Sequence, residues 1–153
     1  MIAIGQREMW LARAELYIAR GEIEQGVRIL DQLGASAKNA GHAGVRAIPY
    51  LALVRGRSLL ALGRIDAAEA DLRAALELTR RWKLRPLEWR ALEACGERLL
   101  ATGKEADARR CFGDALAIVQ QLAAGIEDTA LRHLYLISEP VERLRAKSGA
   151  GAF

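Results

Sequence analysis

The chain has 153 residues, a formal net charge of +4, and a hydrophobic fraction of 52% that contains few aromatic residues. Its apolar residues are mostly Ala and Leu, so the composition predicts an all-α protein that can bury a core without disulfides or metals. The small charge, with acidic residues interspersed, is typical of a mixed solvated surface and argues against a nucleic-acid partner.

Three helical hairpins are expected, over about 5–38, 45–82 and 87–123. The first pairs a helix over about 5–20 with one over about 23–38, and the composition of 39–44 predicts a loop. The second pairs about 45–62 with about 65–82. Pro86 marks the start of the third, which pairs about 87–102 with about 104–123.

Two short capping helices are expected over about 128–147, with Pro140 between them. Leu131, Leu134 and Tyr135 form one apolar stripe in this segment. We expect the segment to cover the third hairpin, because the ends of a repeat array need capping. A single domain over 1–147 and a disordered tail over 148–153 follow from this assignment.

The other end of the array carries no comparable cap, because the first hairpin starts close to Met1. Its outward face is therefore expected to be bare. Two readings stay open: upstream repeats in a longer parent protein, or pairing with a second copy of the chain.

The hairpins carry an internal repeat centred on three glycines, Gly21, Gly63 and Gly103. Each copy has tiny residues seven positions before and five positions after its glycine, and large residues four before and nine after. The tiny residues are Ala14, Gly56 and Gly96 before the glycine and Gly26, Ala68 and Ala108 after it. The large residues are Tyr17, Leu59 and Leu99 before it and Leu30, Leu72 and Phe112 after it.

This pattern predicts a pair of antiparallel helices in each copy. The glycine stands where the chain must reverse, a position that often needs a positive φ. The tiny residues stand where the two helices cross closely, since a larger side chain would push the axes apart. The large residues then fill the space beside the crossing.

The pattern resembles the tetratricopeptide repeat. The second copy matches best, with Gly56, Leu59, Gly63, Ala68, Leu72 and Ala75. The third matches with Gly96, Leu99, Gly103, Ala108, Phe112 and Ala115, and the first is weaker because it has Gly26 and Leu33 where Ala is usual. The copies cover residues 7 to about 122, and the resemblance implies a right-handed α-solenoid of three hairpins.

One departure from the family is the spacing, because the glycines are 42 and 40 residues apart and the standard repeat has about 34. The longer spacing is similar to that of tetratricopeptide regions in bacterial maltose-regulator-type activators and nucleotide-cyclase or ATPase signalling proteins. The resemblance implies a protein-interaction or scaffold module, the C-terminal sensor or regulatory region of a larger bacterial signalling protein that takes part in signal transduction or transcription regulation.

The resemblance also points to the concave face, which in this family is lined by the first helix of each pair. By position it implies Glu8, Leu11 and Glu15 in the first copy, Tyr50, Leu53 and Arg57 in the second, and Arg90, Glu93 and Glu97 in the third. Arg57 and Arg90 could clamp a carboxylate or phosphate. Tyr50 could anchor an apolar side chain of a protein or peptide partner. A mixed-charge face without a ligand is the alternative.

No catalytic motif was found, so we expect neither an enzyme nor a cofactor or metal. The two histidines, His42 and His133, are far apart in sequence, and the two cysteines, Cys95 and Cys111, lack metal-ligand spacing. No stretch approaches the roughly 20 apolar residues of a membrane span, and residues 1–9 do not resemble a signal peptide. We therefore expect a cytoplasmic protein without a membrane partner. A homodimer formed through the first hairpin is the alternative function, and a nucleic-acid binder is the third.

Overall fold

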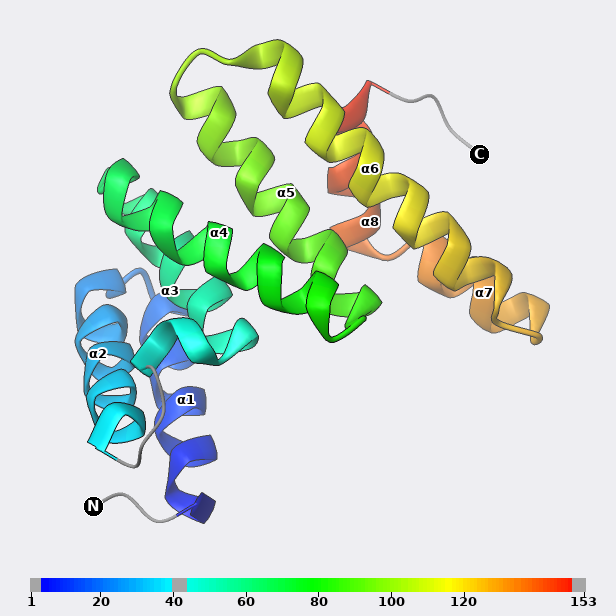
Figure 1. Ribbon diagram of the computed structural model, residues 1–153. Helices are drawn as coiled ribbons and strands as arrows, with labels where there is room; N and C mark the ends of the chain where they lie inside the picture. Colours follow the sequence, from blue (N-terminus) through cyan, green and yellow to red (C-terminus); the bar gives the residue numbers. More distant parts are fainter. Residues whose placement is uncertain (1–3, 40–43, 150–153) are drawn as a thin grey trace. The chain divides into compact units, whose positions relative to one another are not determined.

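The computed structural model describes residues 4–39 and 44–149, and every regular element in these ranges is helical (Figure 1). The described residues form eight α-helices and one 3-10 helix, which together establish the all-α class. In chain order they are α1 (Ile4–Ala19), α2 (Ile23–Asn39), η1 (Gly44–Ala47), α3 (Pro49–Ala61), α4 (Ile65–Arg81), α5 (Arg85–Ala101), α6 (Glu105–Ala124), α7 (Thr129–Leu136) and α8 (Glu139–Ser148).

The chain divides into two compact units, residues 1–78 and residues 79–153. The first unit holds α1 to α3 and most of α4, and the second holds the last turn of α4 and α5 to α8. The expected single domain over 1–147 stays a prediction. No helix in the described ranges is long and apolar enough to cross a membrane.

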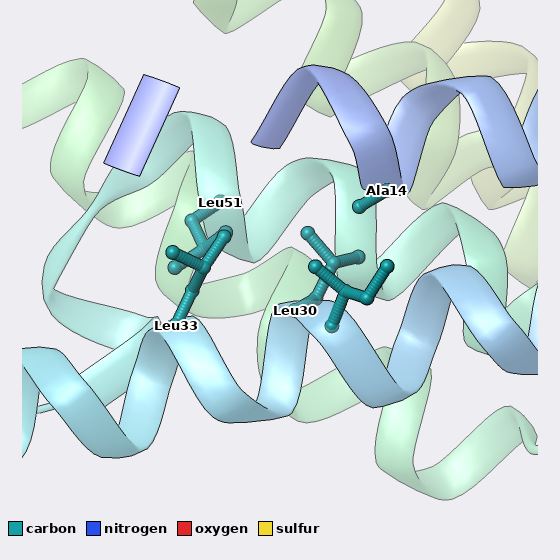
Figure 2. Close-up of a cluster of buried hydrophobic side chains, with 5 residues drawn as sticks. Ala14, Leu30, Leu33 and Leu51 are labelled. Atoms are coloured by element: carbon teal, nitrogen blue, oxygen red, sulfur yellow. The ribbon is translucent and has the colours of Figure 1, made fainter. Parts of the chain in front are cut away.

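The core of the first unit forms where α1, α2 and α3 meet (Figure 2). Ala14, Leu30, Leu33 and Leu51 are buried together there, and Trp10 packs against them from α1. Ala14 and Leu30 stand at the tiny and large offsets of the first copy, seven before and nine after Gly21. The small side chain of Ala14 therefore lies in the same core as the large side chain of Leu30, as the repeat predicts.

The second and third copies pack at the same offsets, with glycine in the tiny position. A Cβ atom added to Gly56 would lie 2.7 Å from the Leu72 side chain, a distance too short for two carbon atoms. One added to Gly96 would overlap the Phe112 ring. Leu72 and Phe112 are each 1% exposed, so neither can move aside freely. Close crossing of the helices therefore requires glycine at both positions.

The three hairpin turns share one hydrogen-bonding pattern. Gly21, Gly63 and Gly103 have φ of +81°, +71° and +73°, as expected for glycines that end helices in a left-handed conformation. In each turn the next residue donates its N–H to the carbonyl five positions earlier, over 2.9 Å, from Glu22 to Tyr17, from Arg64 to Leu59 and from Lys104 to Leu99. These bonds satisfy carbonyls that the helix end would otherwise leave without a partner.

A fourth turn, between α4 and α5, uses the same pattern without glycine. Leu84 donates its N–H to the carbonyl of Thr79 over 2.8 Å, and Lys83 takes the left-handed position with φ of +55°. A side chain in this conformation costs about 1–2 kcal/mol, so the turn at Lys83 is strained.

The second hairpin starts later than expected. A helix was expected from about residue 45, but Gly44–Ala47 forms a 3-10 turn and α3 begins at Pro49. The reason is Ile48, which is extended, with φ of −119° and ψ of 105°, because the residue before a proline is pushed out of the helical region. Of the expected loop over 39–44, residues 40–43 lie outside the described ranges.

In the second unit, α5 and α6 form an antiparallel pair and α8 packs on α6. Val141 and Leu144 of α8 are fully buried, whereas Leu131 and Leu134 of α7 are 58% and 59% exposed. The expectation that the α7 stripe covers the hairpin is therefore wrong for these two leucines, and α8 supplies the buried apolar contacts. Ser148 belongs to α8, so the expected tail starts too early, and residues 150–153 lie outside the described ranges.

The close approach at Gly96 predicts opposite effects for two glycine substitutions in the second unit. Gly96→Ala should lower the free energy of unfolding by about 1–3 kcal/mol, because its methyl group meets the buried Phe112 ring. Gly113→Ala in α6 should raise it by about 0.5–1 kcal/mol, because a Cβ there meets nothing within 4 Å and Ala favours the helix. Urea denaturation measures both, and two changes of the same sign would contradict the crossing.

The strained turn predicts that Lys83→Gly stabilises the protein by about 0.5–1 kcal/mol, since glycine removes the left-handed strain but raises the entropy of the unfolded chain. Lys83→Ala is the matched control, because it removes the charge and keeps the strain. Thermal unfolding should show a gain for Lys83→Gly alone, and equal melting temperatures for the two variants would count against strain at this residue.

Candidate functional site

An apolar groove lies in the first unit between α1, the end of α2 and the start of α3. We call it the α1–α3 groove. It has a volume of about 160 Å³ and is lined by Arg7, Glu8, Leu11, Leu33, Ala37, Ile48, Tyr50 and Leu51. Leu33 and Leu51 form part of the buried core, and Ile48 and Tyr50 are 37% and 36% exposed. The groove therefore joins the buried core to the surface.

Local structure at the start of α3 positions the exposed side of this groove. Pro49 holds Ile48 in an extended conformation directly before the helix, so Ile48 and Tyr50 stand on either side of the first helical residue. The Tyr50 hydroxyl also donates a hydrogen bond to the Glu15 carboxylate, which links α3 to α1 beside the groove. Arg7 and Glu8 also line the groove, mostly through the hydrocarbon parts of their side chains.

A buried carboxylate on α4 stabilises the same region. Asp71 of α4 has a fully buried side chain, accepts hydrogen bonds from Arg46 over 3.0 Å and from Arg55 over 2.9 Å, and so ties η1 and α3 to α4. Arg55 also forms an ion pair with Asp31 of α2, over 2.8 Å. A buried carboxylate needs such partners, because desolvation otherwise disfavours its charge. Sequence reasoning missed this network.

The groove can hold one apolar group of moderate size. An apolar protein cavity of about 150 Å³ is large enough for a benzene molecule. A leucine, methionine or phenylalanine side chain from a partner would therefore fit against Leu11, Leu33 and Leu51, while the charged residues at the edge meet the partner's polar groups. Water is displaced from apolar surface on both sides of such a contact, which favours binding.

The predicted concave-face residues divide into four groups in the structure. Glu8, Leu11 and Tyr50 line the α1–α3 groove, and Glu15 reaches it through Tyr50. Leu53 is 2% exposed and belongs to the core, so it offers no surface to a partner. In the second copy Arg57 is half-buried, and in the third Arg90 is exposed with its guanidinium carbon 5.4 Å from the centre of the Trp89 ring.

The remaining two predicted residues, Glu93 and Glu97, are bound by the chain itself. Lys147 of α8 donates from its Nζ to Glu93 over 2.9 Å and to Glu97 over 2.5 Å. The Glu93 side chain is only 3% exposed, and Lys147 lies 54 residues further along the chain. The two carboxylates thus fix α8 to α5 rather than presenting an open acidic surface.

The pKa of Lys147 reflects this environment. Burial lowers the pKa, but the hydrogen bonds and negative charges of Glu93 and Glu97 outweigh it, so the pKa lies above the ordinary value of 10.5. The charged form of Lys147 is therefore stabilised by folding.

The thiols of Cys95 in α5 and Cys111 in α6 are both half-buried. Burial raises the pKa of the Cys111 thiol above its usual 9.0, and the charges of Asp114 and Asp107 act in the same direction. A raised pKa keeps the thiol protonated and weakly nucleophilic at neutral pH. Within the described ranges, no three His, Cys, Asp or Glu residues gather as a metal site.

Comparisons with protein-family models, with curated proteins and with solved structures found no match to this chain.

The pairing of Lys147 predicts that Lys147→Ala lowers the free energy of unfolding by about 2 kcal/mol, because Glu93 would stay buried after losing the hydrogen bond from Lys147. Adding Glu93→Gln to this variant should recover part of the loss, since the amide is cheaper to bury than the charge. Denaturant unfolding of the single and double variants gives the coupling energy, and strictly additive effects would contradict the pairing.

The raised pKa of Lys147 also predicts how the stability lost in Lys147→Ala depends on pH. Because Lys147 binds its proton more tightly in the folded state, its contribution is fully present below pH 10.5 and is lost as pH rises through the folded-state pKa. The difference in stability between the wild type and Lys147→Ala should therefore be constant at neutral pH and shrink in strong alkali.

Proposed function

We propose that this protein is a protein-interaction module whose α1–α3 groove receives an apolar side chain of a protein or peptide partner. The observation that carries the proposal is the groove itself, an apolar depression edged by Arg7 and Glu8 and linked to the core through Leu33 and Leu51. Three of its lining residues are among those that the family resemblance assigns to the concave face. Binding rather than catalysis also suits a site whose lining is mostly hydrocarbon.

The charges near the groove favour a particular partner segment. Glu8 lines the groove, and Glu15 accepts a hydrogen bond from Tyr50. The helix α1 therefore carries two carboxylates near the groove and one cation, Arg7. A segment with an apolar side chain flanked by Lys or Arg complements this arrangement. Burying one such side chain contributes about 1.5–3 kcal/mol before the costs of association, so we expect weak and reversible binding by a single segment.

We further propose that the helical hairpins form a right-handed α-solenoid of the tetratricopeptide type and serve as the regulatory region of a larger bacterial signalling protein. The support is the agreement of the three copies in both turn and crossing, together with the long repeat spacing. In such an array, a partner that binds the first helices of the pairs would transmit a signal by changing the arrangement of the hairpins.

Selection from a displayed peptide library tests the groove. Peptides that bind the full chain should share an apolar residue flanked by basic ones, and their affinity should fall at least about tenfold in Ile48→Glu, because a charge would enter the apolar contact. Leu100→Glu is the matched control, since Leu100 is similarly exposed, at 45%, but lies on α5. Equal losses in both variants, or retained binding in Ile48→Glu, would refute the assignment of the groove.

Self-association through the first hairpin is a second candidate, and the surface of α1 supports it. Met9 and Leu16 are 68% and 51% exposed and stand seven residues apart, so they lie on one side of the helix. Two such stripes could pair across a two-fold axis. Sedimentation should then show a dimer that Leu16→Arg dissociates, and a wild-type chain that stays monomeric at high concentration would dispose of this candidate.

A further inference from the structure

The turn that connects α4 to α5 concentrates positive charge and exposed apolar surface. We call residues 80–85 the basic corner; they are Arg80, Arg81, Trp82, Lys83, Leu84 and Arg85. All six belong to the second unit, and five of them are exposed, Arg85 being half-buried. Trp82 is 51% exposed and Leu84 is 37% exposed. Four cations and two apolar side chains thus share one solvent-exposed turn.

One carboxylate holds the outer cations of this corner in place. Glu88 has a side chain that is only 7% exposed, and it accepts hydrogen bonds from Arg85 over 3.0 Å and from Arg80 over 3.4 Å. Both arginines still expose 41% or more of their side chains. Within the described ranges, Arg81 and Lys83 form no ion pair with a carboxylate. The corner therefore keeps an excess of positive charge in a fixed arrangement.

The strained backbone of Lys83 sets this turn apart from the other turns of the same shape. Gly21, Gly63 and Gly103 occupy the left-handed position in those turns, where glycine carries no steric cost. In the turn between α4 and α5 this position carries a side chain despite the steric cost. The residue is Lys83, next to the exposed Trp82. Strain of this kind often marks a functional position.

We propose that the basic corner docks on the surface of an anionic lipid bilayer. Trp82 and Leu84 would enter the interfacial layer, while Arg81, Lys83 and Arg85 meet the phosphate and carboxylate head groups. Tryptophan prefers this layer because its ring is apolar and its N–H is polar. Each Lys or Arg close to such a surface contributes about 1 kcal/mol, which is about a fivefold gain in binding. This inference is independent of the α1–α3 groove.

The composition of the corner favours a bilayer over a nucleic acid. Single-stranded nucleic acids are held by several aromatic rings on which successive bases stack. Here Trp82 is the only aromatic residue of the corner, and the nearby Trp89 is 3% exposed. Leu84 has no role in base stacking but adds apolar area for a bilayer. The proposal departs from our expectation of no membrane partner, which rested on the lack of a membrane-spanning segment.

Vesicle binding of the full chain tests the proposal. The chain should bind vesicles that contain phosphatidylserine, bind those of phosphatidylcholine alone much less, and lose affinity as salt is added. Arg81→Gln with Lys83→Gln should weaken binding about 25-fold, from about fivefold for each charge. The control, Lys104→Gln with Arg110→Gln, removes the same charge from exposed positions outside the corner and should change binding less than about threefold.

Tryptophan fluorescence supplies a second readout. On binding, the emission should shift to the blue as Trp82 leaves water, and Trp82→Phe should abolish the shift while Trp10 and Trp89 stay. Equal binding to both kinds of vesicle, or equal losses in the corner and control variants, would overturn the proposal. So would tighter binding to an oligothymidylate than to the vesicles, with quenching of Trp82, which would assign the corner to nucleic acid instead.

Discussion

The close crossing of paired helices at a tiny residue is the constraint on which the rest of the fold depends. Gly56 meets Leu72 and Gly96 meets Phe112, and Ala14 shares a core with Leu30 at the equivalent offsets. In each pair the large side chain of one helix occupies the volume that a side chain of the other would need. The crossing therefore fixes the separation of the helices, and the left-handed turns place the second helix in register with the first.

The α1–α3 groove follows from this constraint and from two local features. The approach of Gly56 to Leu72 positions α3 on α4, and Asp71 binds η1 and α3 through Arg46 and Arg55. Pro49 then determines where α3 can begin, which leaves Ile48 exposed beside Leu11. An apolar depression remains between two helices whose positions are fixed, so a partner would bind a largely preformed site. Binding would then cost the protein little conformational entropy.

Much of the fold could be predicted from the sequence because its determinants are local. Helix propensity and glycine turns act over a few residues, and the repeat placed tiny and large residues at the helix crossings. The late start of α3 was also visible in principle, since Ile48 precedes a proline. The strained turn was harder to predict from the sequence, because lysine has no preference for the left-handed conformation that Lys83 adopts.

The site was less predictable because it depends on pairings between distant positions. Glu93 and Glu97 have the spacing of a solvated helix face, and only the packing of α8 brings Lys147 to them. Asp71 likewise gives no sign in the sequence that it is buried with two arginines. Glu8, Leu11 and Tyr50, which were predicted for the concave face, line the groove, whereas Leu53 was predicted for the same face and is buried.

The central claim is that partners bind in the α1–α3 groove, and methyl NMR of the full chain titrated with a library-selected peptide tests it most directly. Binding in the groove predicts that the methyl signals of Leu11, Leu33, Ile48 and Leu51 shift together and saturate with the affinity of the peptide. Shifts confined to the exposed leucines of α7, Leu131 and Leu134, with the groove signals unchanged, would contradict the claim.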